Sequence, residues 1–312
     1  MFKKVRRIGK EYCTAIYNKL YNRPMGYVWM FHRVAPADGA LPIIDELRVS
    51  PQYFRNFLLD KINGGGEIVD LQYVIECIDK GSNCDKPFHV ITFDDGYEDN
   101  YKYAYPILKE LGIPFTIYVS VDLVDDHRPI WNYPLIIEKI VRNNDFIKLS
   151  NGNVYECNTE EEKCNTFIQL KSLLFSLPYK TLQFEFKKLF DNYLCDNAYP
   201  INTLTWEQIK ILSEDELCTI GSHTMSHCRL AMSDIDFLTY ELKNSKDILS
   251  QKIGKPVEHL SYPYGWITDV SDEAAEIAQK VGYKTAFHSF GGPIRKKYKD
   301  LFHLKRIMVN EK

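Results

Sequence analysis

The sharpest local feature of the sequence is the stretch VITFDDGYEDN, residues 90–100. It opens as an apolar, β-branched run typical of a buried strand and ends abruptly at Asp94-Asp95-Gly96. Enzymes with parallel α/β sheets bind their ligands at the carboxyl ends of the strands, so paired acids at this point predict a functional site. A helix N-cap followed by a solvated acid is the alternative, and the motif alone leaves both interpretations open.

Similar short apolar runs alternate with helix-like segments along the chain, as they do in βα units. The predicted strands are Tyr27–Phe31, Glu67–Leu71, Phe88–Phe93, Pro114–Ser120, Leu217–Ser222, His259–Tyr262, Lys284–His288 and Leu304–Val309. The predicted helices are Pro51–Ile62, Leu71–Lys80, Asn100–Leu111, Ile235–Ile253 and Ser271–Val281, with N-caps at Ser50 and Ser271 and stops at Gly112 and Gly282. Eight strands separated by crossovers predict an α/β barrel.

The alternation is interrupted over about residues 131–215, because a simple βα unit joins its strands with far fewer residues. Three amphipathic stretches in this range predict helices, and a hairpin turned at Asn151-Gly152 is predicted between the first two. We interpret the range as a helical lid inserted into one barrel domain that spans residues 26–312.

Composition narrows the class of function. The 312 residues carry 39 Lys and Arg against 42 Asp and Glu, a net charge of −3, which gives no overall bias towards nucleic acid. Eight scattered cysteines without a CxxC pair argue against a zinc ribbon or a disulfide scaffold, so reduced, buried thiols are expected.

Residues 1–25 form a basic N-terminal segment. Residues 1–24 hold seven basic side chains against one acid, Glu11, a net charge of +6, and their apolar positions recur at helical spacing. This pattern predicts peripheral contact with an anionic membrane surface, while a solvated helix packed on the body of the protein is the alternative. Without a signal peptide or an apolar run long enough to span a bilayer, the chain is expected in the cytoplasm or at the inner membrane face. Oligomeric state has no signal in the sequence.

A second motif, LCTIGSHTMSHC at residues 217–228, ends another predicted strand with His223 and His227. Their spacing lets two imidazoles converge, and a carboxylate from Asp94-Asp95 would complete a metal site of two histidines and one acid. The metalloprotease HExxH pattern is excluded, because no Glu lies between the histidines. Taken alone, such a pair is more often an ordinary surface feature.

Two further segments follow predicted strands. In LSYPYGW, residues 260–266, Pro263 and Gly265 predict a tight turn that can point backbone N–H groups into a site. In WMFHRV, His32 follows an alternating strand and becomes a candidate proton donor only if the other motifs converge beside it.

Together these motifs resemble the polysaccharide deacetylases of carbohydrate esterase family 4, the NodB-homology group. TFDDGY is similar to that family's first motif, which implies Asp94 as the catalytic base and Asp95 as a metal ligand. SHTMSH is similar to the second, which implies His223 and His227 as the other ligands. SYPYG is similar to the third, in which the backbone N–H of Tyr264 would stabilise an oxyanion.

The resemblance covers roughly residues 26–309. It implies a distorted, commonly seven-stranded (β/α) barrel with one divalent metal ion. Zn²⁺ is the ion expected first, and other transition metals stay open. The partner it implies is an acetylated glycan rather than nucleic acid, and abundant aromatic side chains are expected to stack on its sugar rings, with Trp131 and Trp266 nearest the predicted mouth.

The chain also departs from the family pattern. Ser261 occupies a position where many members carry an Arg that orients the base, and no late Leu-x-His-Asp segment supplies an acid. In both departures the chain resembles the exopolysaccharide poly-N-acetylglucosamine deacetylases. An early histidine acts as the acid in that subgroup, which implies this role for His32. Arg306, in LKRIMV, is the candidate for the missing Arg, and His288 is a second candidate acid.

The resemblance implies metal-dependent removal of N-acetyl groups from a surface polysaccharide or its lipid-linked precursor. An O-acetyl esterase or another amide hydrolase would use the same residues. A catalytically silent carbohydrate-binding barrel is the alternative from a different class, and the missing Arg is its motivation.

Overall fold

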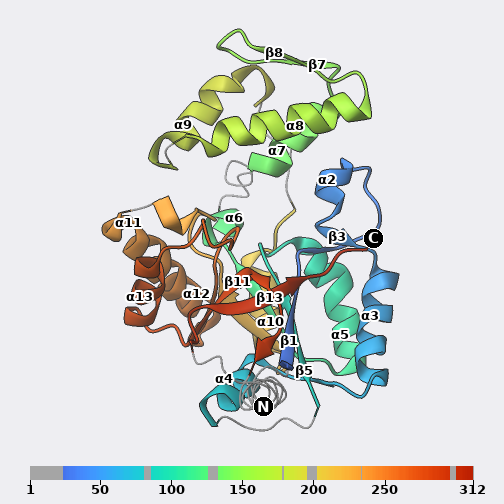
Figure 1. Ribbon diagram of the computed structural model, residues 1–312, viewed down its shortest axis with the longest axis vertical. Helices are drawn as coiled ribbons and strands as arrows, with labels where there is room; N and C mark the ends of the chain where they lie inside the picture. Colours follow the sequence, from blue (N-terminus) through green and yellow to red (C-terminus); the bar gives the residue numbers. More distant parts are fainter. Residues whose placement is uncertain are drawn as a thin grey trace, which may run out of the picture.

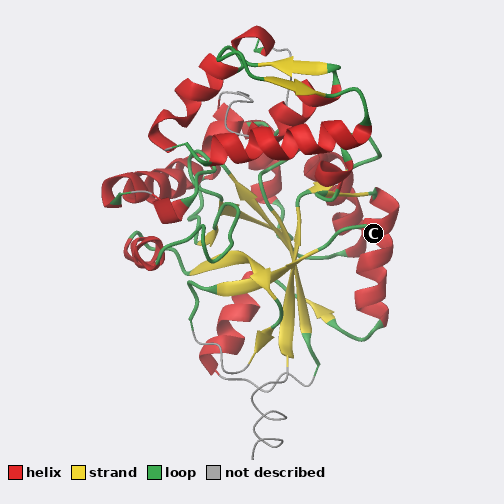
Figure 2. Ribbon diagram, turned by 45° about the horizontal axis from the view of Figure 1, so that its top comes forward, coloured by secondary structure: helices red, strands yellow, loops and turns green. Residues whose placement is uncertain are grey.

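The computed structural model describes residues 24–80, 86–125, 133–177, 179–194, 202–232, 234–295 and 300–311. Seven parallel strands close into a barrel at its centre, because β1 pairs with β13 on one side and with β5 on the other (Figure 2). In order around the barrel they are β1 (Pro24–Phe31), β5 (Phe88–Phe93), β6 (Phe115–Val119), β9 (Cys218–Ser222), β10 (His259–Ser261), β11 (Thr285–Gly291) and β13 (Leu304–Met308). The predicted seven-stranded (β/α) barrel is confirmed.

One of the eight predicted strands lies outside the closed ring. The segment predicted as Glu67–Leu71 forms only the two-residue strand β4 (Glu67–Ile68), which pairs with β5 alone. Asp70 explains why it is short: its side chain accepts a hydrogen bond from the Tyr73 N–H and so starts helix α4 at Leu71. The other short strands are β2 (Arg33–Val34), β3 (Arg48–Val49) and the antiparallel β12 (Ile294–Arg295).

Helices surround the barrel, and their starts follow the predicted capping residues. Ser50 and Ser271 each accept a hydrogen bond from the backbone N–H three residues later. These helices are α2 (Pro42–Asp45), α3 (Pro51–Asn63), α4 (Leu71–Lys80), α5 (Tyr105–Leu111), α6 (Val121–Asp125), α10 (Trp206–Glu214), α11 (Ile235–Thr239), α12 (Ser245–Ile253) and α13 (Asp272–Lys280). Two of the predicted helices contain π-helical turns, η1 (Asn100–Ala104) before α5 and η5 (Tyr240–Asn244) between α11 and α12. The described residues also form two 3₁₀ turns, η3 (Asp191–Tyr193) and η4 (Leu230–Met232).

The barrel interior is apolar towards one end of its axis and polar towards the other. Towards the amino ends of the strands it is filled by fully buried Val28, Val90, Tyr118 and Phe287. Side chains at the carboxyl ends are polar and include Asp94 and Arg306. The period-two alternation of a strand produces this change, because Val28 and Val90 point inwards four residues before His32 and Asp94.

A layer of helices and one hairpin covers the carboxyl ends of the barrel strands (Figure 1). It consists of α7 (Tyr133–Arg142), β7 (Phe146–Lys148), β8 (Val154–Glu156), α8 (Glu160–Phe175) and α9 (Tyr179–Leu189). The hairpin turns at Gly152, where φ is +91°, as its sequence predicts. This layer has a hydrophobic core of its own, which also takes in Leu41, Ile44 and Tyr97 from the barrel side. Helix α10, at the end of the range 131–215, packs against β9 of the barrel.

The amino-terminal basic segment lies outside the described residues, except that β1 already begins at Pro24. Since His32 follows the carboxyl end of β1, Pro24 lies at the opposite end of the barrel. No helix in the described ranges is long and apolar enough to cross a bilayer. The five described cysteines are free thiols, and Cys13, Cys84 and Cys195 lie outside these ranges.

Candidate metal and catalytic site

One cavity of about 700 Å³ opens at the carboxyl ends of the barrel strands beneath the inserted layer. Eight of the residues singled out from the sequence line it: His32, Asp94, Asp95, His223, His227, Tyr264, Trp266 and Arg306, whereas His288 is not part of its lining. They come from β1, β5, β9, β10 and β13 or the loops that follow these strands, so closure of the barrel brings distant motifs together. Trp131, the other aromatic candidate, lies outside the described residues.

Backbone strain gathers at this cavity. Among the described residues, four non-glycine residues have a positive φ: Asp95, Thr224, His227 and Tyr264. All four belong to the three sequence motifs, and such conformations persist only where surrounding contacts fix them. The surrounding contacts therefore stabilise strained backbone conformations at the edge of the cavity.

Asp95, His223 and His227 form a compact group that fits a metal ion. Their candidate ligand atoms all lie within 4.8 Å of one another. The Nε2 atoms of His223 and His227 lie 3.3 and 3.2 Å from Asp95 Oδ1, which is buried and has no hydrogen-bond donor of good geometry. A buried carboxylate oxygen that faces two imidazole nitrogens in this way is a donor set suited to a cation.

The orientation of His223 is fixed from behind. Its Nδ1 lies 2.7 Å from the carbonyl oxygen of Ser261, so Nδ1 carries the proton and Nε2 presents its lone pair to the cavity. Burial opposes a charge on this ring, but Asp94 and Asp95 raise its pKa above the usual value. Burial also opposes the ionisation of Asp95, yet the two histidines hold its pKa well below the usual value. The charges of Asp94 and Asp95 therefore favour a cation beside His223 and His227.

Asp94 lies in a separate network with Arg306. The guanidinium donates to both carboxylate oxygens, with NH1 2.7 Å from Oδ1 and NH2 2.6 Å from Oδ2. Ser261 Oγ donates to Asp94 Oδ2 at 3.1 Å and accepts from Arg306 NH2 at 2.7 Å. Burial opposes ionisation, but Arg306 and His223 lower the pKa of Asp94 below its usual value, so Asp94 is a carboxylate at neutral pH.

Ser261 and Arg306 together hold the Asp94 carboxylate in place. Arg306 is fully buried, and its Nε donates to the carbonyl oxygen of His288 while NH1 also donates to Thr92. A small hydroxyl at position 261 leaves room for a guanidinium that arrives from β13 instead of from β10. The structure thus places an arginine against Asp94, although position 261 holds none.

The two candidate acids differ in where their rings face. His32 lines the cavity, its Nδ1 is buried without a hydrogen-bond partner, and its backbone carbonyl accepts from Asn100. Burial lowers the pKa of His32, while Asp95 and Asp94 oppose that shift. In His288, Nδ1 lies 3.1 Å from the Gly265 carbonyl oxygen and Nε2 lies 3.0 Å from His303. Of the two candidate acids, His32 alone lines the cavity and has a ring nitrogen without a hydrogen-bond partner among the described residues.

The third motif forms one wall of the cavity. Tyr264 has a φ of +59° and packs edge-on against His227, with ring centroids 4.8 Å apart, while its carbonyl accepts from Ser289. Gly265 follows with a φ of +63°, and a Cβ there would lie 2.5 Å from the backbone nitrogen of Ser289. Only glycine fits this close approach. Trp266, 60% exposed, stacks on Phe290 at the rim.

Glu241 is a residue that the motifs do not reveal. It is buried in η5, where Oε1 accepts from Ser226 Oγ at 2.6 Å and Oε2 accepts from the Ser226 N–H at 3.0 Å. Both contacts hold the loop between His223 and His227. A signal is present in the sequence, because Glu241 lies on the same helical face as the buried Leu238, Leu242 and Leu249.

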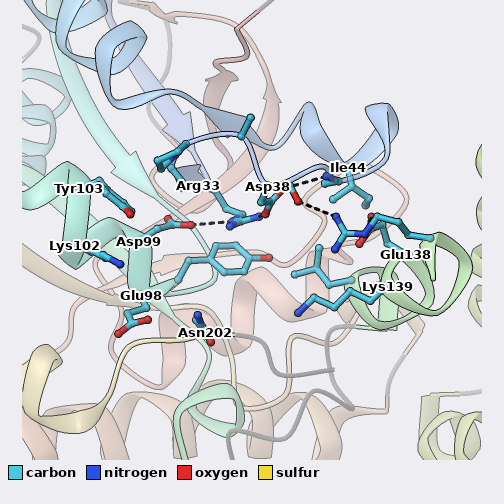
Figure 3. A pocket seen from close by; sticks show the side chains of 17 residues that line it. Arg33, Asp38, Ile44, Glu98, Asp99, Lys102, Tyr103, Glu138, Lys139 and Asn202 are labelled. Atoms are coloured by element: carbon cyan, nitrogen blue, oxygen red, sulfur yellow. Dashed lines mark hydrogen bonds and ion pairs between the residues drawn. The ribbon is translucent and has the colours of Figure 1, made fainter. Parts of the chain in front are cut away.

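A second cavity of about 380 Å³ adjoins the first and shares Ile44, Tyr97 and Leu135 with it. Figure 3 shows Arg33 between Asp99 and Asp38, with Nε 2.9 Å from Asp99 and NH1 2.9 Å from Asp38. Arg142 lies 3.6 Å from the buried Glu138. The arginines here are therefore neutralised within the protein.

Comparison with known proteins agrees with this architecture. The sequence model of the family described as polysaccharide deacetylase matches residues 81–286, from before the paired acids to beyond the third motif. The chain belongs to the polysaccharide deacetylase family. A 30-residue stretch is also 60% identical to YxkH of Bacillus subtilis (strain 168), a protein named for these deacetylases, but it covers only 10% of this chain and 11% of YxkH.

Several solved structures share the barrel. Streptococcus pyogenes deacetylase PplD, solved with acetate, has a TM-score of 0.61 at 19% identity over 92% of this chain and 94% of that one. IcaB from Ammonifex degensii has a TM-score of 0.61 at 17% identity over 92% and 93%. BC0361, a polysaccharide deacetylase from Bacillus cereus, has a TM-score of 0.57 at 21% identity over 91% and 64%. At these identities the likeness establishes a shared fold.

Proposed function

We propose that this family member is a metal-dependent hydrolase that removes N-acetyl groups from N-acetylated sugars of a surface polysaccharide or its lipid-linked precursor. The observation that carries the proposal is the pairing of two carboxylates in one cavity, since Asp94 is held by Arg306 while Asp95 faces two imidazole nitrogens. Adjacent acids with different partners suit different tasks, a proton acceptor and a metal ligand.

Asp95, His223 and His227 would hold the ion, and the mixed nitrogen and oxygen donor set suits Zn²⁺ or another transition metal. A divalent ion at this position supplies Lewis-acid polarisation of an acetamide carbonyl and makes a nearby water more acidic. The Ser261 carbonyl keeps His223 in the required tautomer.

The remaining steps fall to side chains already in place. Asp94, ionised and oriented by Arg306, accepts the proton of the attacking water. The backbone N–H of Tyr264, in its left-handed conformation, stabilises the oxyanion, an effect worth about 3 kcal/mol for a well-placed donor. His32 donates a proton to the departing sugar amine, which leaves acetate and a free amine. Trp266 and Phe290 offer an aromatic surface at the rim for a sugar ring.

The alternative hypothesis is a catalytically silent carbohydrate-binding barrel. That alternative rested on the missing arginine of the third motif, and Arg306 supplies a guanidinium to both oxygens of Asp94. Membrane contact through residues 1–24 stays a prediction.

Acetate release from matched substrates tests the proposed function. Purified protein is expected to release acetate from N-acetylglucosamine oligomers faster than from O-acetylated xylan, with a free amine formed for each acetate. Preferential release from the O-acetyl substrate would make the protein an esterase. No release from either kind of substrate that depends on Asp94 would refute the proposal.

His32→Ala is expected to slow amide hydrolysis by about 10²-fold or more, because an amine leaves only with a proton. Hydrolysis of p-nitrophenyl acetate is expected to change much less, because its phenolate departs without one. The ratio of the two rates is the measurement, and His288→Ala is the comparison. A larger change of this ratio in the His288 variant would assign the acid to His288.

Glu241→Ala is expected to weaken Zn²⁺ binding by about 10- to 100-fold, because the loop that carries His223 and His227 loses its anchor. Competition with a chromophoric chelator measures this affinity. Glu241→Gln, which keeps an acceptor, should bind nearly as tightly as the original protein. Glu138→Ala removes an equally buried carboxyl outside the metal group and is the control. Equal losses of metal affinity in both Ala variants would show a general effect on folding.

A further inference from the structure

Lys171 is a cation that the inserted layer contributes to the catalytic cavity. It lies on α8 and lines the cavity together with Pro134, Leu135 and Phe167 of the same layer. The side chain is half-buried, and this burial lowers the pKa of its amine below the usual value. Its ammonium nitrogen lies 5.3 Å from the centre of the Phe175 ring, and Lys171 donates no hydrogen bond to another described residue.

Lys171 differs from the arginines of the two cavities, each of which is paired with a carboxylate. Arg306 pairs with Asp94, Arg33 with Asp38 and Asp99, and Arg142 with Glu138. Within the described ranges of the chain, no carboxylate lies within ion-pair distance of Lys171. A partly desolvated ammonium costs free energy unless an anion compensates for it.

The acids of the catalytic cavity do not provide that anion. Asp94 is neutralised by the bidentate Arg306, and Asp95 faces the two histidines and the cation they would bind. The other residues that the inserted layer contributes to the cavity lining, Pro134, Leu135 and Phe167, are apolar and offer no counter-charge. A negatively charged group that enters the cavity would find its counter-charge at this position.

We propose that Lys171 binds an anionic group, phosphate or carboxylate, carried by the N-acetylated substrate. This inference rests on the proposed function and narrows its substrate to acidic glycans or phosphorylated precursors. Because Lys171 comes from the inserted layer rather than from the barrel, the insertion would select the substrate while the barrel carries out the chemistry.

Steady-state kinetics with a matched pair of substrates test the proposal. The pair is a neutral N-acetylglucosamine oligomer and the same oligomer with a 6-phosphate. Lys171→Met is expected to raise KM for the phosphorylated oligomer by about tenfold or more with kcat within twofold, and to leave both constants for the neutral oligomer unchanged. Lys171→Arg should restore the low KM. Lys187→Met removes an exposed lysine of the same layer and is the control.

Two results would overturn the proposal: equal losses for both oligomers, or no preference of the original protein for the phosphorylated one. Calorimetric binding to the zinc-loaded protein keeps this test separate from that of the proposed function, since it needs no turnover. N-acetylglucosamine 6-phosphate is expected to bind more tightly than N-acetylglucosamine, and Lys171→Met should abolish the difference. If only inorganic phosphate binds in a Lys171-dependent manner, the group bound is a free ion, and the assignment to substrate is wrong.

Discussion

Asp94→Asn is expected to lower kcat for acetate release by about 10²- to 10⁴-fold, the range typical for loss of a positioned general base. The amide keeps the shape of the side chain but accepts no proton from water. Zinc affinity should stay within a few-fold, because Asp94 lies in the Arg306 network and not in the metal group. Rates from single-turnover assays together with zinc stoichiometry separate the two effects.

Asp45→Asn is the matched control for this variant. Asp45 also accepts two hydrogen bonds from one arginine, Arg48, but the pair lies outside the catalytic cavity. Its substitution is expected to leave kcat unchanged. If Asp94→Asn kept more than a tenth of the original kcat, Asp94 would not be the base.

Arg306→Met is expected to destabilise the fold by about 3–5 kcal/mol, because Asp94 would stay buried without its counter-charge. Activity should fall with it, since the base loses its orientation. Arg306→Lys keeps the charge but not the paired donors, so an intermediate loss is expected. Urea unfolding in the presence of a chelator measures the stability without a contribution from metal binding.

The stability lost in Arg306→Met is expected to depend on pH. Arg306 holds the pKa of Asp94 below its unfolded value of 3.8, so the contribution of the pair is present above that pH and is lost as the pH falls through the folded pKa. Without Arg306, burial raises the pKa of Asp94. The difference in stability between the two proteins is therefore expected to be largest at neutral pH and to shrink towards pH 4 and below.

Arg48→Met is the comparison for the stability measurement. Its partner Asp45 is 39% exposed at the side chain, so the expected loss is about 0–1 kcal/mol with little change with pH. A loss for Arg306→Met as small as that for Arg48→Met, or one independent of pH, would contradict the account of the Asp94 network.

The motifs predict the site because each of them ends a strand. Asp94, His223 and Tyr264 follow β5, β9 and β10, and the parallel arrangement carries all strand ends to one edge. Arg306 could be placed for the same reason, since it lies near the carboxyl end of the last strand. The motifs do not predict the contact between Arg306 and Asp94. This contact depends on the small side chain of Ser261, which leaves room for the guanidinium from β13.

Other features depend on tertiary contacts that local patterns do not encode. The segment 67–71 has the composition of a strand, but the cap at Asp70 ends it after two residues. Lys171 looks like an ordinary helix position in the sequence, and Glu241 shows there only as an acid on an apolar helix face. Their significance appears only when η5 is packed behind the histidine loop and α8 is laid over the cavity.

Metal-dependent deacetylation is tested by acetate release during a titration of metal-stripped protein with Zn²⁺. We expect stripped protein to release no acetate from an N-acetylglucosamine oligomer, and activity to rise to a plateau at one Zn²⁺ per chain. In the Asp95→Asn variant the plateau should need a far higher concentration of zinc. Activity that survives stripping, or that ignores both added zinc and the Asp95 substitution, would contradict the account.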